Sequence, residues 1–116
     1  MNEYSKDNII LSLTLEFAID IISYCEQLEQ TKKYIIARQL LKSGTSIGAN
    51  SREAQNAESR ADFIHKFKVA AKEAEETEYW ILLCEKSNGY PGTGNLMNKL
   101  KNIQRIINKI IKTSRM

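Results

Sequence analysis

Apolar residues in this chain recur at alternating steps of three and four, and four separate segments keep this spacing. The longest unbroken series lies between residues 60 and 87, and its members are Phe63, Phe67, Ala70, Ala74, Thr77, Ile81 and Cys84. Such steps place side chains on one face of an α-helix, in the pattern of a helix-bundle seam. The spacing therefore predicts a helix over 60–87 that buries one face against other helices.

The whole chain divides into helical segments with short connections. The predicted helices span 8–29, 33–57, 60–87 and 95–113. No segment alternates apolar and polar residues with period two, so no strand is predicted. Glycine and proline gather only between Asn88 and Gly94, which is the one strong loop pattern. Short connections make neighbouring helices antiparallel. We therefore expect an all-α, antiparallel up-down four-helix bundle that forms a single domain over 1–116.

The segment 33–57 is the least regular of the four. Its inward series is Ile36, Leu40, Ser43, Ile47, Asn50, Ala54 and Ala57. The centre, from Ser43 to Asn50, is a poor helix former by propensity. We nevertheless expect one continuous helix, because the apolar spacing keeps its phase on both sides. Gly44 and Gly48 would then share a face and allow a neighbouring backbone to approach. The alternative is a loop at these glycines, which would give five helices.

Composition favours a soluble protein. Of 116 residues, 42% are hydrophobic and 27% are charged, which is a globular balance. No apolar run approaches the ~20 residues of a membrane span. Residues 1–7 do not resemble a signal peptide, so a cytoplasmic location is expected. Cys25 and Cys84 fall at apolar helical positions, which favours buried thiols over a disulfide or a metal site.

The charge is unevenly distributed. The net charge is +3, yet residues 95–116 carry six cations and no acid, so the remainder of the chain is −3. Four of these cations lie within about 80° of one another on a helical wheel, opposite the apolar residues. They are Lys101, Arg105, Lys109 and Lys112. A stripe of this kind can bind the phosphates of RNA or DNA. The alternative is an ordinary solvated face, with lysines favoured near a helix C-terminus.

Polar residues at inward positions of the second helix form another candidate site. They are Ser43, Ser46, Asn50 and Glu53. One interpretation is a buried hydrogen-bond network that fixes helix register. The other is a subunit interface or ligand pocket. Trp80 is expected to anchor the core or an interface. The acids between Glu73 and Glu78 are interpreted as a charged face and not as a catalytic pair.

No catalytic set is predicted. Asp62 and His65 have the spacing of half a di-iron motif, but His65 is the only histidine. No phosphate loop, nucleophile elbow or zinc spacing is present. We therefore expect no enzyme activity, no metal, no cofactor and no small-molecule substrate.

Ser59, with an acid three residues later, predicts a helix start at that point.

Two runs of residues resemble a known family. The first runs from Arg38 to Asn50 and continues to Glu53 and Ala54, and the second runs from Asp62 to Trp80. They are similar to the signature of four-helix-bundle proteins encoded by intervening sequences in bacterial 23S rRNA genes. The resemblance implies a ring-like homopentamer without a settled activity. A related branch, the accessory variability protein of diversity-generating retroelements, is far more basic and binds nucleic acid.

These observations predict a non-catalytic oligomer that contacts RNA or DNA through its last helix. The alternative is a protein-protein adaptor or scaffold with no nucleic-acid binding. An enzyme with an unfamiliar site is a third hypothesis.

Overall fold

A computed structural model describes residues 8–116 of the chain. Its helices are α1 (Ile9–Gln30), α2 (Tyr34–Ala54), α3 (Arg60–Lys86) and α4 (Leu96–Ser114). The four-helix prediction is confirmed, and every helix end but one lies within one residue of its predicted position. The exception is α2, which ends at Ala54 and not at residue 57. Residues 1–7, on which the signal-peptide expectation rests, lie outside the described part.

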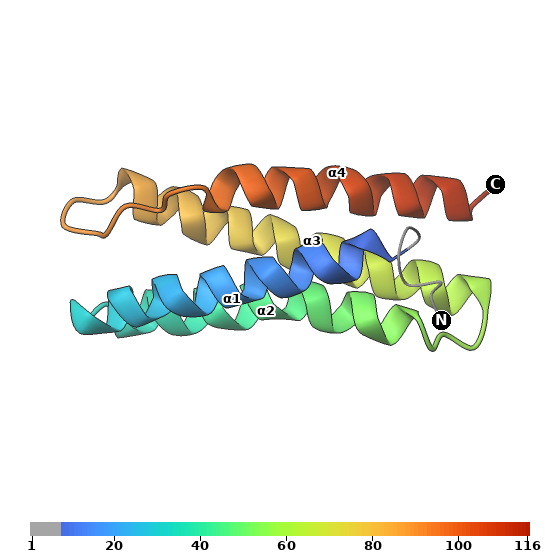
Figure 1. Ribbon diagram of the computed structural model, residues 1–116, viewed down its shortest axis with the longest axis horizontal. Helices are drawn as coiled ribbons and strands as arrows, with labels where there is room; N and C mark the ends of the chain where they lie inside the picture. The colour runs from blue at the N-terminus through green and yellow to red at the C-terminus, as the bar shows by residue number, and fades with distance from the viewer. Residues whose placement is uncertain (1–7) are drawn as a thin grey trace.

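The helices run side by side along the long axis of a body measuring 46 × 24 × 21 Å (Figure 1). α2 packs extensively on both α1 and α3, whereas α4 packs on α3 and, less extensively, on α1. α1 and α3 therefore occupy diagonal corners of the bundle. The α1–α2 turn and the α3–α4 loop lie at one end, and the C-terminus lies at the other (Figure 1).

The predicted seam of α3 forms part of the core. Six of its seven members are buried, and the seventh, Phe63, is half-buried with its ring edge-on to Phe67 at 5.0 Å. α4 likewise buries its predicted face, including Leu100 and Ile103. Each helix contributes its apolar stripe to one shared core, as the spacing predicted.

α2 is continuous through its glycine- and serine-rich centre, so the five-helix alternative is wrong. Close approach to α1 explains the two glycines. A Cβ atom at Gly44 would lie 3.0 Å from side-chain atoms of Ile21, and one at Gly48 would lie 3.2 Å from Thr14. Because both neighbours are fully buried, neither can turn away. The glycines therefore set the spacing of the α1–α2 pair.

Replacing Gly44 by alanine should destabilise the protein by about 1–2 kcal/mol, because overpacking at Ile21 outweighs the gain in helix propensity. Urea unfolding followed by circular dichroism measures this change. Ala49→Gly, on the exposed side of α2, is the matched control and reports propensity alone, a loss of about 1 kcal/mol. A Gly44→Ala variant more stable than the wild type would contradict the close-approach explanation.

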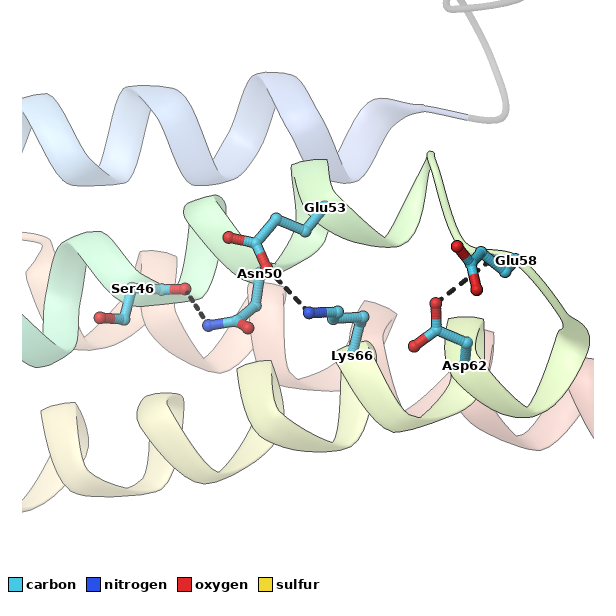
Figure 2. Close-up of polar contacts among 6 residues, drawn as sticks. All are labelled: Ser46, Asn50, Glu53, Glu58, Asp62 and Lys66. Atoms are coloured by element: carbon cyan, nitrogen blue, oxygen red, sulfur yellow. Dashed lines mark hydrogen bonds and ion pairs between the residues drawn. The ribbon is translucent and has the colours of Figure 1, made fainter.

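The start of α3 carries the predicted cap. The Asp62 backbone N–H donates to Ser59 Oγ at 3.0 Å. Asp62 Oδ2 accepts from the Glu58 N–H at 3.2 Å, a contact drawn in Figure 2. The return bond therefore reaches one residue further back than in an ordinary capping box. Both bonds satisfy backbone donors where the α2–α3 connection turns.

Both cysteines are free and buried, as predicted. The Cys25 thiol donates to the Ala37 carbonyl oxygen at 3.4 Å. Burial raises the pKa of Cys25 to about 12 and also raises the pKa of Cys84.

Because the thiolate is the reactive form, we expect both cysteines of the native protein to react with iodoacetamide orders of magnitude more slowly than in urea. Mass spectrometry of labelling time courses measures the rates. Similar rates in native and unfolded protein would show that this end of the core is open.

Candidate functional site

The basic face of α4, defined as Lys101, Arg105, Lys109 and Lys112, lies on the solvent side of the bundle. All four residues are exposed, while Leu100, Ile103 and Ile107 on the other side of the helix are buried. The predicted geometry of the stripe is therefore confirmed. The capacity of the stripe to bind an anion depends on which of its cations already have a carboxylate partner.

Lys101 is the member of the face whose charge is already balanced. Its Nζ lies 2.8 Å from Glu78 Oε2, and the other oxygen of Glu78 accepts from Gln104 at 3.1 Å. These two donors hold the pKa of Glu78 below its usual value. A carboxylate from α3 thus competes with any phosphate for Lys101.

The other three cations of the face have no such competitor. Within residues 8–116, no carboxylate forms an ion pair with Arg105, Lys109 or Lys112. Arg105 donates to the side-chain oxygen of Asn102, one turn earlier on the same face, and this neutral acceptor leaves its charge unbalanced. The part of the stripe best suited to an anion is therefore its C-terminal two-thirds.

A polar ridge, defined as Ser46, Asn50 and Glu53, follows α2 along its contact with α3 (Figure 2). Asn50 Nδ2 donates to the Ser46 carbonyl oxygen at 2.9 Å, and Ser46 Oγ donates to the Lys42 carbonyl oxygen at 2.7 Å. Glu53 Oε1 lies 3.0 Å from Lys66 Nζ on α3, and this partner raises the pKa of Lys66. The first two bonds lie within α2, and the Glu53–Lys66 ion pair joins the two helices at their surface.

The four polar residues of α2 that were predicted to point inward include Ser43 and the three residues of the ridge. The prediction is wrong for most of them. Ser43 is buried, but Ser46 and Asn50 are half-buried and Glu53 is exposed. Ser51 takes the fully buried place predicted for Asn50, with its hydroxyl 2.9 Å from the Ile47 carbonyl oxygen. The reason is that α2 packs against two helices. The predicted series follows its contact with α3, whereas a second stripe faces α1. That stripe contains Ala37, Gly44 and Ser51.

One predicted inward hydroxyl joins α2 to α3 in the core. Ser43 Oγ and Thr77 Oγ1 are hydrogen-bonded at 2.9 Å, and both residues are buried. Thr77 also donates to the Glu73 carbonyl oxygen at 2.7 Å. The Ser43–Thr77 bond is therefore the buried contact through which the predicted polar network of α2 reaches α3.

The acids of α3 are directed to different partners. Glu76 accepts from Trp80 Nε1 at 3.0 Å, whereas Glu78 bonds to α4. Burial, with a smaller effect of Glu76, raises the pKa of Glu73. Trp80 is half-buried against the core, as expected of an anchor, while the adjacent Tyr79 is 56% exposed.

Two exposed apolar patches were missed by sequence reasoning. The α1–α2 patch comprises Leu15, Ile19, Ile22 and Leu41, and the α3 patch comprises Tyr79 and Leu82. Ile19 is the most exposed member of the first patch at 58%. The sequence does contain a signal for the first patch, because Leu15, Ile19 and Ile22 form a second apolar series on the first helix, beside its inward series. It was overlooked because one stripe per helix already accounted for the core.

Metal and membrane sites gain no support from the described residues. No group of three His, Cys, Asp or Glu side chains in residues 8–116 could hold a metal ion. No helix in this part of the chain is long and apolar enough to cross a membrane.

The bundle and its surface define an all-α four-helix-bundle protein. The chain matches the family of the 23S rRNA-intervening sequence protein over residues 6–109, and it belongs to that family. A crystal structure from the S23 ribosomal protein family of Bacteroides thetaiotaomicron, a protein with unknown function, is similar at a TM-score of 0.85. The two share 40% identity, covering 90% of this chain and 99% of that one. No curated protein matches the chain.

Proposed function

We propose that this protein is a non-catalytic bundle that assembles with copies of itself and binds RNA or DNA through the basic face of α4. The observation that carries the proposal is the row of Arg105, Lys109 and Lys112. These cations are exposed, share one face and have no carboxylate partner within residues 8–116. Such a row favours phosphate contacts that do not depend on base sequence.

Assembly would multiply a weak contact. Three cations on one chain make few phosphate contacts, but several copies on one strand bind with an increased effective concentration. The family resemblance implies a homopentamer, which would present five such faces.

The apolar patches support assembly in a particular form. The α1–α2 patch and the α3 patch differ in composition, and three of the four residues of the first lie on α1, diagonally opposite α3. A contact between one patch and the other on the next copy is heterologous, and heterologous contacts generate rings when they close. This arrangement is consistent with a pentameric ring.

The absence of catalysis is also part of the proposal. It is supported by the hydroxyl groups of α2, which are engaged by the helix itself. Thr45, Ser46 and Ser51 each donate to the carbonyl oxygen four residues earlier, at 2.8, 2.7 and 2.9 Å. A hydroxyl held in this way is a poor nucleophile, because its proton faces a carbonyl and not a base.

Salt dependence tests the binding proposal. We expect labelled RNA and DNA oligonucleotides to bind the purified protein, with the logarithm of affinity falling by at least about 2 to 3 per tenfold rise in salt, the slope for the three phosphate contacts of one chain. Fluorescence anisotropy at several salt concentrations measures this slope. No binding in ~50 mM salt, or binding that salt leaves unchanged, would contradict the proposal.

The apolar patches also favour the second candidate, a protein-protein adaptor without nucleic-acid binding. Their exposure would serve a different protein equally well. A chain that stays monomeric and binds no nucleic acid would support this alternative over the main proposal.

A further inference from the structure

Figure 1 shows the α1–α2 turn and the α3–α4 loop at the same end of the bundle. A cleft of about 300 Å³ lies between residues of these two connections. Its lining is Lys32, Lys33, Tyr34, Ile35, Ile36 and Tyr90, and we call it the end cleft. The lining contains two cations, two aromatic rings and no carboxylate. It is separate from the basic face of α4 and from both apolar patches.

The aromatic part of the end cleft is open to solvent. Tyr34 is 53% exposed and Ile35 is 75% exposed, although both belong to the first turn of α2. Apolar and aromatic area left uncovered beside cations is a surface that a flat aromatic ligand can cover.

Two contacts hold the residues around the cleft in place. Tyr24 in the core donates its hydroxyl proton to the Pro91 carbonyl oxygen at 2.8 Å, which ties the α3–α4 loop to α1. Lys33 Nζ lies 5.1 Å from the centre of the Tyr90 ring, a cation–π contact that holds the ammonium at the cleft. Tyr90 is half-buried and carries Lys33 over one face of its ring, whereas Tyr34 is exposed, so Tyr34 is the ring better placed for stacking.

Lys32 occupies a backbone position that favours glycine. Its φ angle is 65°, in the left-handed region. The Lys33 N–H bonds to the Leu28 carbonyl oxygen and the Lys32 N–H to that of Glu29, which is the Schellman pattern that ends α1. Because the Lys32 side chain is exposed, packing does not explain a lysine here. The strained position keeps a cation beside the cleft.

We propose that the end cleft binds a nucleotide unit, with its base stacked on Tyr34 and its phosphate held by Lys32 and Lys33. Stacking uses the face of any base, and the two ammonium groups complement the phosphate charge. The unit comes either from a free nucleotide or from a single strand. In the second case the inference rests on the proposed function and extends it, because α4 itself offers no aromatic side chain for bases.

Lys32→Gly separates binding from folding. Glycine adopts the left-handed conformation without strain, so this variant should unfold at a higher temperature than the wild type while binding more weakly. Tyr34→Ala should weaken binding about five- to a hundredfold, the loss of one base stack, whereas Tyr34→Phe should retain it. Lys72→Ala, an exposed lysine on α3, is the control and should leave binding unchanged.

The probes are adenosine monophosphate and a labelled ten-nucleotide adenylate strand, with backbone amide NMR shifts and anisotropy as readouts. Shift changes concentrated at residues 32–36 and 90 would support the cleft. Binding of the monophosphate that survives glutamate substitutions on α4 would support it even if the proposed function fails. Equal affinity of the wild type and Tyr34→Ala for both probes would overturn it.

Discussion

Replacing Arg105, Lys109 and Lys112 together by glutamate is expected to lower the affinity for RNA and DNA by at least about a hundredfold in 0.1 M salt. The substitutions remove three attractive charges and place three repulsive ones on the same face. All three residues are exposed, so the fold should be retained. Anisotropy titration measures the affinity, and circular dichroism checks the helix content.

The control for this experiment is a triple variant with the same change in net charge elsewhere. Lys68, Lys72 and Lys86 are exposed on α3 and can be replaced by glutamate in the same way. If this variant binds as weakly as the α4 variant, net charge and not the α4 face governs binding. Lys101→Ala should have a smaller effect than Lys109→Ala, because Glu78 already balances Lys101.

Introducing a charge into either apolar patch is expected to reduce the assembly to single chains. Ile19→Glu alters the α1–α2 patch and Tyr79→Glu alters the α3 patch, both at positions more than half exposed. A charge buried at an interface without a partner is strongly unfavourable, whereas on the surface of a monomer it costs little. Light scattering after size-exclusion chromatography measures the mass.

Mixing the two variants gives the sharper result. Each retains one intact patch, so a heterologous contact predicts that the mixture forms a one-to-one pair and nothing larger. Gln27→Arg, on a different side of α1, is the control and should assemble like the wild type. Monomeric wild-type protein, or assembly unaffected by Ile19→Glu, would contradict the proposed interface.

Much of the fold could be predicted because each helix carries its own periodic signal. The spacing in α3 identified its buried residues from Phe67 to Cys84, and the cap at Ser59 located its start. The apolar spacing of α2 did not predict that this helix packs between two others. Its buried residues form two stripes, and a single series could describe only one of them. Asn50 was therefore predicted in the place that Ser51 occupies.

The candidate sites were predictable only in part, for a related reason. The helical wheel placed Arg105 and Lys109 on the surface, because that requires only the period of one helix. The pairing of Lys101 with Glu78 depends on how α3 and α4 are packed, which no local pattern records. The end cleft combines a turn with a loop more than fifty residues away, so its lining became apparent only in three dimensions.

The uneven packing of α4 has a consequence for how the molecule opens. This helix packs mainly on α3, while α1, α2 and α3 are joined through extensive contacts on both sides of α2. Hydrogen exchange should therefore proceed fastest through detachment of α4 as a unit, with the other three helices still protected. Any ligand that requires α4 to be docked would slow that exchange by mass action.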